Sequence, residues 1–328
     1  MRYYFRNPNT IYMSEQEAPI IVDTVEKTPT ETPAPTPVVD AASLPTIDEV
    51  MNETWARIKA RFWSFTLLAA IPVISVLVIG LLLVILFILF PSLFSTLSVH
   101  TMSDLKFPFG VFIPLGIAGL AIIAVTVWSM LALYTQAISP VQIPIKQAFL
   151  ENKSRFFPFI WLSLLLGIII CGSFVFFVIP AVIFSIFFVF WIFTFLVEGE
   201  RGMAALLKSR EYVRGNWWKT LGYMSILFVV SIVLSFILRL TEKVSVGLSG
   251  LLNLAYQIFF PMFTAVYLSV LFSKYQIAKK GVTITATKKD KWVYLGTGIL
   301  GFLLMFGVLA GTVLFFRHNP TMLLMLLK

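Results

Sequence analysis

Long uncharged apolar runs constrain this chain more than any other feature. Residues 64–90 contain 20 Leu, Ile, Val or Phe and no charged side chain. A helix needs roughly 20 apolar residues to cross the hydrocarbon core of a bilayer. Charged residues make up only 12% of the 328 residues, against about 25% in an average soluble domain. We therefore expect an integral membrane protein.

The same pattern recurs and predicts an all-α, polytopic helical bundle with about seven transmembrane helices. The run 156–197 is too long for one crossing, and it is interrupted at Gly172-Ser173 and Ile179-Pro180. Proline lacks an amide hydrogen and disfavours a continuing helix, so we expect a tight helical hairpin there. The predicted spans are 64–90, 111–135, 156–176, 180–197, 219–239, 250–273 and 293–316.

Three short basic stretches, at 57–63, 153–157 and 210–218, each close on a pair of aromatic residues at the start of a predicted span. Amphipathic rings are favoured at headgroup depth, and cations there face an anionic leaflet. Anchoring alone explains such stretches, whereas recognition of anionic phospholipid headgroups is the sharper hypothesis. The candidate lipid-facing residues are Arg57, Arg61, Trp63, Arg155, Phe157, Arg210, Arg214, Trp217, Trp218 and Lys219.

Short amphipathic patterns accompany these stretches and predict interfacial helices on the cytoplasmic side. The clearest begins at the capping box Thr46-x-x-Glu49, and shorter ones lie at 145–156 and 203–217. Together with the spans they define three units of one interfacial helix and two spans, a six-span membrane domain over 46–275. We expect a disordered Pro/Thr-rich acidic tail at 1–45, and a basic loop with the seventh span at 276–328.

Basic residues predict which side of the membrane each loop faces. Segments expected on one side carry 17 Lys and Arg near the spans, whereas those on the other side carry five. Because the loops that carry more Lys and Arg are cytoplasmic, we expect a cytoplasmic N-terminus and an external C-terminus. We also expect the natural start at Met13, since residues 1–12 match neither the polar tail nor a span.

Residue types that carry catalysis or bind metals are sparse. The histidines His100 and His318 lie in external segments, and the single Cys171 lies within an apolar run. Glu198 and Glu200 stand beside an arginine at the end of a span, where a salt-bridge or helix-end role is favoured over acid–base catalysis. We therefore predict no catalytic residues, no metal site, no cofactor and no nucleic-acid partner.

Polar side chains at membrane depth are most frequent in the sixth predicted span. Asn253, Tyr256 and Gln257 fall on one helix face, and Thr264 follows Pro261, which frees a backbone carbonyl. This set predicts either an intramembrane polar cavity or hydrogen bonds between helices.

The seventh predicted span carries the motif Gly307-x-x-x-Gly311, which together with Gly296, Gly298 and Gly301 offers a surface for close helix packing. Two uses remain open for it. The motif docks this span on the bundle, or it forms a homo-oligomer with a second copy.

The segment 197–218 resembles the membrane domain of bacterial glycerophosphoryl diester phosphodiesterases, which also occurs in stand-alone proteins. An acid and a glycine follow a span, then come Ala205-Leu206-x-x-Ser209 and Arg214-Gly215-x-Trp217-Trp218. The Ile179-Pro180 break and the helix from Ile47 to Trp63 also fit, so the resemblance covers about 46–275. It implies the fold and says little about activity.

The catalytic signature of that enzyme family, a His-Arg pair with a Glu-Asn partner, does not occur in this sequence. We therefore expect a non-enzymatic protein of the bacterial cytoplasmic (inner) membrane, structural or lipid-interacting in the cell envelope, with anionic phospholipids as partners. The alternative is a transporter or channel component for a small or amphipathic solute, which would use the polar residues of the sixth span.

Overall fold

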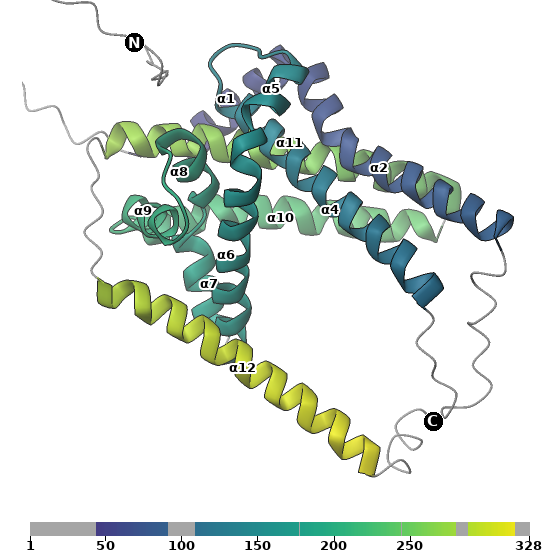
Figure 1. Ribbon diagram of the computed structural model, residues 1–328. Coiled ribbons are helices and arrows are strands. Elements are labelled where there is room, and N and C mark those ends of the chain that lie inside the picture. The colour runs from purple at the N-terminus through teal and green to yellow at the C-terminus, as the bar shows by residue number, and fades with distance from the viewer. Residues whose placement is uncertain (1–43, 91–108, 177, 244, 280–287, 319–328) are drawn as a thin grey trace, which may run out of the picture. The chain divides into compact units, whose positions relative to one another are not determined.

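The computed structural model describes residues 44–90, 109–176, 178–243, 245–279 and 288–318 (Figure 1). Every regular element in these ranges is helical. The predicted all-α, multi-pass membrane architecture is confirmed, since seven segments are long and apolar enough to cross a membrane. These segments are Phe62–Leu89, Ile113–Ile138, Ile145–Val175, Val178–Glu198, Trp217–Glu242, Val246–Ala278 and Lys289–Thr312. The predicted tail up to residue 43, the proposed start at Met13, and His100 lie outside the described residues.

A long helix supplies six of the seven segments, the third of which also includes α5 and η3, and the fourth is divided between two helices (Figure 1). The long helices are α2 (Phe62–Leu89), α4 (Phe109–Ile138), α6 (Phe156–Phe176), α10 (Trp217–Glu242), α11 (Val246–Ala278) and α12 (Lys288–His318). The fourth segment consists of α7 (Val178–Phe187) and α8 (Trp191–Glu198). Shorter elements are α1 (Ile47–Ala60), α5 (Ile145–Glu151), the single-turn η3 (Lys153–Arg155) and α9 (Met203–Val213).

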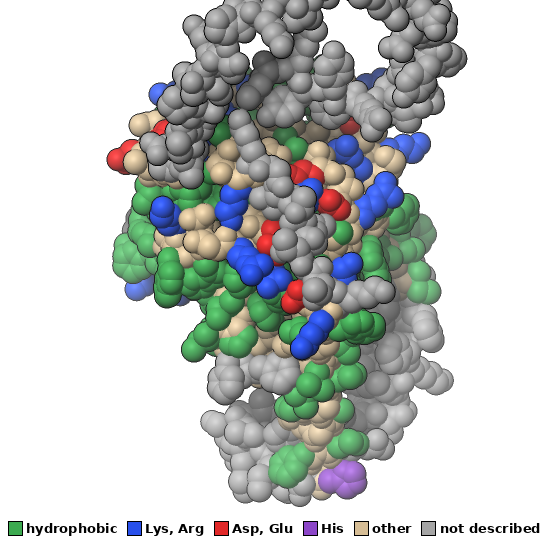
Figure 2. Space-filling view, turned by 90° about the vertical axis from the view of Figure 1, so that its left-hand side faces the viewer, with side chains coloured by type: hydrophobic (Ala, Val, Ile, Leu, Met, Phe, Trp, Pro, Cys, Tyr) green, Lys and Arg blue, Asp and Glu red, His purple; other side chains and the backbone are tan. Residues whose placement is uncertain are grey.

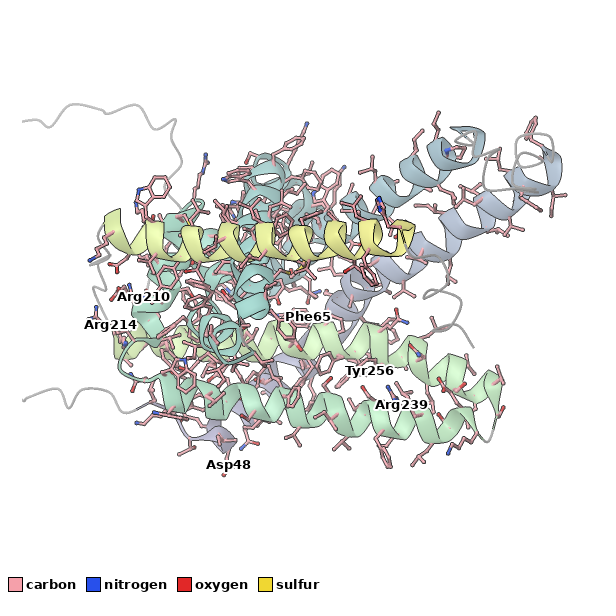
Figure 3. All side chains as sticks on the ribbon, turned by 90° about the horizontal axis from the view of Figure 1, so that it is seen from below. Asp48, Phe65, Arg210, Arg214, Arg239 and Tyr256 are labelled. Carbon is pink, nitrogen blue, oxygen red and sulfur yellow. The ribbon has the colours of Figure 1, made fainter. Side chains whose placement is uncertain are left out.

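Hydrogen bonds and ion pairs bring one end of most of these helices together. Arg61, at the start of α2, bonds the end of α4, and Gln276, at the end of α11, bonds Glu198 at the end of α8. Arg210 of α9 lies 3.9 Å from Asp290 at the start of α12. We call this the basic end of the bundle: the starts of α2, α6, α10 and α12, and the ends of α4, α8 and α11. From the region of Arg210, helices α10, α11 and α12 run toward the opposite end (Figure 3).

In α2, α10 and α11, burial is concentrated in the half nearest the basic end. In α2 the buried residues all lie between Ser64 and Ala69, and in α10 between Thr220 and Leu227. In α11 they run from Met262 to Tyr275. The other halves expose Leu, Ile, Val and Phe side chains, which suits contact with lipid chains. The packed core therefore supports the basic end.

Proline and serine together shape the contact between α2 and α4. Pro72 has no amide hydrogen, so the carbonyl of Leu68 four residues earlier loses its helical partner. The buried hydroxyl of Ser129 in α4 donates to that carbonyl at 2.5 Å. A freed backbone group inside the membrane is thereby satisfied by a neighbouring helix.

The break between α7 and α8 occurs in an apolar stretch without glycine or proline. Ser209 of α9 occupies it. The Phe190 N–H donates to Ser209 Oγ at 3.0 Å, and that hydroxyl donates to the Phe187 carbonyl at 2.9 Å. In a continuous helix, this N–H and this carbonyl would bond other backbone groups of the same helix. Here the Ser209 hydroxyl of α9 bonds both of them.

The three short helices pack differently, although each precedes a pair of spans. Helix α1 lies against α11 and buries Val50, Thr54 and Ile58, while α5 packs against α4. Helix α9 packs on α8, α7 and α6, and seven of its 11 residues are buried. The apolar side chains of α9 therefore pack inside the protein, and its position at the membrane interface stays a prediction.

Glycines allow a close helix contact where α12 crosses α6. A Cβ added at Gly172 would lie 2.0 Å from the Gly298 carbonyl oxygen, and one at Gly301 would lie 1.9 Å from the Gly172 oxygen. By contrast, nothing lies within 4 Å of a Cβ added at Gly307 or Gly311. The seventh span docks on the bundle, one of the two predicted alternatives. Of the predicted glycines, Gly298 and Gly301 make the contact, whereas Gly307 and Gly311 do not.

Candidate membrane-interface site

Four exposed aromatic side chains mark the basic end. Trp63, Phe157 and Trp218 are the second residues of α2, α6 and α10, and their exposed fractions are 75%, 78% and 78%. Trp292, in the second turn of α12, is 71% exposed. All four helices that start at the basic end therefore present an exposed ring within their first two turns.

Two of the three predicted aromatic pairs divide their rings between two environments, whereas Phe62 and Trp63 are both exposed. Trp217 is partly buried against the core and stacks edge-on with Trp218 at 4.7 Å between ring centroids. Phe156 is likewise partly buried and contacts Phe157 edge-on at 5.4 Å. One ring fixes the helix start on the bundle, and the next ring points outward. Trp292 was not among the candidate residues predicted from the sequence. The lysines that precede it were the sequence feature that could have identified it as an interface residue.

Several candidate cations bond the protein itself. The Arg61 guanidinium donates to the Ser139 carbonyl at 2.7 Å and also to the Pro140 carbonyl. These carbonyls follow the end of α4, where the last turn of a helix leaves acceptors without partners. Arg61 therefore joins the corner between α1 and α2 to the end of α4.

Arg210 is also directed inward. Its guanidinium lies over the Tyr294 ring at 5.5 Å and 3.9 Å from both Glu211 and Asp290, and its side chain is 19% exposed. These contacts fix the start of α12 on α9. Arg57 is paired with Glu53 at 2.7 Å, within α1.

The remaining candidate cations reach the surface of the basic end. Arg214 is 63% exposed and lies 3.6 Å from Glu211, Lys219 is exposed, and Arg155 is half-buried. Further exposed cations, which were not in the candidate set, surround them: Lys59, Lys146, Lys153, Arg201, Lys289 and Lys291. Seen from this end, basic and acidic side chains are intermixed over one region, with hydrophobic side chains below it (Figure 2).

The motif segment 198–218 forms a polar layer beneath this surface. Glu198 accepts from the Tyr212 hydroxyl and from Gln276 at 3.3 Å, and it lies 3.0 Å from Lys208. Partial burial by itself lowers the pKa of Lys208, but Glu198 and Glu200 outweigh it and leave that pKa raised. Burial, reinforced by Glu198, also raises the pKa of Tyr212. These shifts keep Lys208 protonated and charged and Tyr212 neutral at physiological pH, so the layer is a fixed network rather than an acid–base pair.

Backbone geometry explains the glycines of this segment. Gly199, Gly202 and Gly215 have φ of +72°, +55° and +83°, a region that favours glycine. Gly199 ends α8, where the Glu200 N–H donates to the Thr194 carbonyl at 3.3 Å. Gly215 turns the chain from α9 into α10. Sharp turns on both sides of α9 place it against α7 and α8.

Lys279 closes the same turn from the end of α11. Its ammonium donates to the Glu211 carbonyl at 3.0 Å and to the Arg214 carbonyl. Burial lowers the pKa of this lysine, while the charge of Glu211 opposes that effect. Like Arg61, Lys279 serves as a cap on helix-end carbonyls rather than as an exposed charge.

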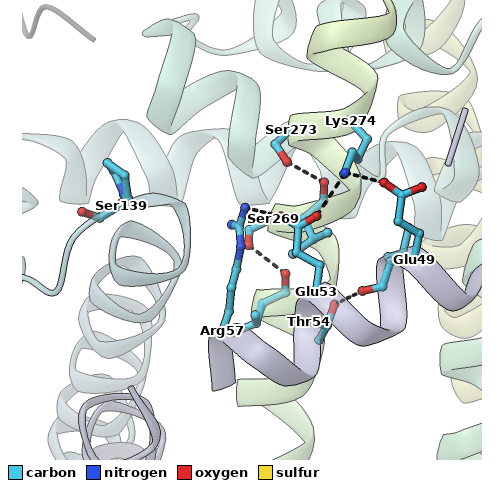
Figure 4. A network of polar contacts seen from close by, with 12 residues as sticks. Glu49, Glu53, Thr54, Arg57, Ser139, Ser269, Ser273 and Lys274 are labelled. Carbon is cyan, nitrogen blue, oxygen red and sulfur yellow. Dashed lines mark hydrogen bonds and ion pairs between the residues drawn. The ribbon is translucent and has the colours of Figure 1, made fainter. Parts of the chain in front are cut away.

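An ion-pair network holds α1 on α11 (Figure 4). Lys274 lies 2.7 Å from Glu49 and 3.1 Å from Glu53, and Glu53 also pairs with Arg57. Partial burial raises the pKa of Glu53, but the hydrogen bonds and charges of Lys274 and Arg57 outweigh this and leave the pKa lowered. The Thr46 hydroxyl accepts from the Glu49 N–H at 3.4 Å, so one half of the predicted capping box is present.

The predicted polar set of α11 is not gathered around one space. Gln257 donates to Asn253 at 2.9 Å, and both side chains are exposed on the outside of α11. Tyr256 instead points toward α10 and lies 3.3 Å from Ser231 (Figure 3). Thr264 lies deeper, and its Oγ1 is buried without a hydrogen-bond partner in the described part of the chain.

Within the described residues, no group of three His, Cys, Asp or Glu side chains is arranged to hold a metal ion. Comparison with known families gives one match, a domain of unknown function (DUF7847), over residues 159–255. The match covers α6 to the first part of α11, under a third of the chain, and includes the motif segment 198–218. Neither curated proteins nor solved structures match this chain.

Proposed function

We propose that this is a non-enzymatic, lipid-interacting protein of the bacterial cytoplasmic membrane, with the basic end in the cytoplasmic leaflet. One observation carries the proposal: every helix that starts at the basic end presents an exposed ring, on Trp63, Phe157, Trp218 or Trp292. Aromatic rings concentrate at the membrane–water boundary, where their flat faces suit the headgroup region. In this orientation the N-terminus is cytoplasmic and the C-terminus is external.

Exposed cations beside those rings favour anionic headgroups. Arg61 and Arg210 contact other parts of the protein. Of the other candidate cations, Arg214 and Lys219 are exposed and Arg155 is half-buried, so all three reach the surface. A basic residue near an anionic leaflet contributes about 1 kcal/mol of attraction.

Retention of lipids by the purified protein tests this proposal. The full chain is placed in nanodiscs of equal phosphatidylglycerol and phosphatidylcholine, and the retained lipids are identified by native mass spectrometry. We expect enrichment of phosphatidylglycerol. The double variant Arg155→Gln, Lys219→Gln should lower that preference by up to roughly 30-fold, the equivalent of about 1 kcal/mol per cation.

A matched control has the same charge change at the opposite end. Arg239 and Lys243 are exposed there, and Figure 3 shows Arg239 far from Arg210 and Arg214. The variant Arg239→Gln, Lys243→Gln should leave the lipid preference unchanged. Equal retention of both lipids by the wild-type protein would refute headgroup recognition and leave membrane anchoring as the role of the basic end.

The alternative function, passage of a small or amphipathic solute, has weaker support. It requires Asn253, Gln257 and Thr264 to face a common space, but the two amides bond each other on the outside of α11. The resemblance to the phosphodiesterase membrane domain stays a proposal about ancestry. It agrees with a membrane role and assigns no reaction.

A further inference from the structure

The outer half of α11 carries a helix-packing seam that no part of the described chain covers. Val246, Gly250, Asn253 and Gln257 are spaced by four, three and four residues, the spacing of positions that meet a partner helix. Val246 is 84% exposed, Asn253 and Gln257 are exposed, and nothing lies within 4 Å of a Cβ added at Gly250. The face toward α10 is separate, since Tyr256 occupies it.

The two amides make this seam unfavourable in lipid and favourable against a copy of itself. Gln257 Nε2 donates to Asn253 Oδ1 at 2.9 Å. That bond leaves the Asn253 amide as an open donor and the Gln257 oxygen as an open acceptor. Hydrocarbon can satisfy neither group, whereas a neighbouring membrane helix can satisfy both.

We propose that a second copy of this chain docks on the Val246–Gln257 seam, as a two-fold symmetric dimer. Symmetry places the same surface on both partners, so a donor on one copy faces an acceptor on the other, and the contact occurs twice. Gly250 lies one turn outward from Asn253 and has no side chain to hold the helices apart. The interface is distinct from the predicted Gly307/Gly311 surface and does not depend on lipid recognition at the basic end.

Cysteine cross-linking in native membranes tests the dimer with the full chain. Cys171 is exposed and is first changed to serine. The variant Val246→Cys places a reporter on the seam and keeps both amides. Ala255→Cys is the matched control, because Ala255 is exposed two residues from Asn253 on the opposite side of α11. We expect efficient disulfide-linked dimers from Val246→Cys and little cross-linking from Ala255→Cys.

A second comparison assigns the contact to the amides. Adding Asn253→Leu and Gln257→Leu to Val246→Cys should reduce the cross-linked fraction at low expression, with dimer affinity lowered roughly 10- to 100-fold by loss of two symmetric bonds. Equal cross-linking at Val246 and Ala255 would overturn the proposal, as expected if only lipid covers the seam. Faster cross-linking from Gly307→Cys than from Val246→Cys would also overturn it and assign the interface to α12.

Discussion

Replacing Gly172 with alanine should separate α12 from α6 and destabilise the protein. The added methyl carbon would lie 2.0 Å from the Gly298 carbonyl oxygen, whereas ordinary contacts begin at 3.4 Å. The obstructing atoms belong to backbone, so the helices must move apart by roughly 1.5 Å rather than rearrange a side chain. A gap of that size removes much of the dispersion attraction along the crossing.

The expected cost is about 1–3 kcal/mol, the usual range for overpacking a well-packed contact. Gly301→Ala should behave in the same way, because its methyl carbon would lie 1.9 Å from the Gly172 oxygen. The matched control is Gly307→Ala on the same helix, where no atom lies within 4 Å. There alanine should be neutral or stabilising by up to about 1 kcal/mol, since it favours a helix more than glycine does.

Thermal unfolding of the detergent-solubilised protein, followed by size-exclusion chromatography after heating, measures these effects. We expect lower midpoints for Gly172→Ala and Gly301→Ala and an unchanged or higher midpoint for Gly307→Ala. If all three variants share the midpoint of the wild type, the close crossing of α6 and α12 is refuted.

Three further changes test other parts of the structure. Ser209→Ala removes the group that bonds both sides of the α7–α8 break and should cost about 1–3 kcal/mol in thermal unfolding, whereas a midpoint within error of the wild type would contradict the role of Ser209. The pKa of Glu53 is lowered, so its pairing with Lys274 stabilises the docking of α1 at pH values above the ordinary glutamate pKa. This stabilisation is lost as the pH falls through the lowered pKa of Glu53. The protection of the α1 amides, corrected for the pH dependence of intrinsic exchange, should therefore fall on acidification below about pH 4.5, by an amount equivalent to at most about 1 kcal/mol, and Glu53→Gln should abolish this loss of protection. Arg61→Ala should lower thermal stability without altering the preference for anionic lipid. Lys219→Ala should lower that lipid preference without altering thermal stability. The same result for both variants would refute the division between internal and surface cations.

The positions of the membrane-spanning helices could be predicted because their cause is local. Twenty or so consecutive apolar residues are sufficient for a span. Pro180 lies in the first turn of α7, where its missing amide hydrogen is tolerated. The break between Phe187 and Trp191 could not be predicted in this way. Ser209, which bonds the two backbone groups at the break, lies in a different helix 19 to 22 residues along the sequence.

The candidate site was less predictable, because an arginine has the same sequence signature whether it meets lipid or protein. Arg61 and Arg155 both precede an aromatic residue at a span start, yet only Arg61 caps the carbonyls at the end of α4. The difference depends on which helix end lies beside each side chain. The apolar pattern of α9 was likewise visible, but the choice between lipid and protein as its partner is set by tertiary packing.

Sidedness is the central claim, and cysteine accessibility tests it most directly. In a Cys171→Ser background, single cysteines replace Lys219 and Lys289 at the basic end and Lys243 at the opposite end, all of which are exposed. A membrane-impermeant maleimide is applied to intact bacterial cells made permeable only in the outer membrane. The proposed orientation predicts labelling at position 243 alone, with positions 219 and 289 labelled only after the inner membrane is opened. Labelling of positions 219 and 289 in intact cells, with position 243 protected, would contradict it.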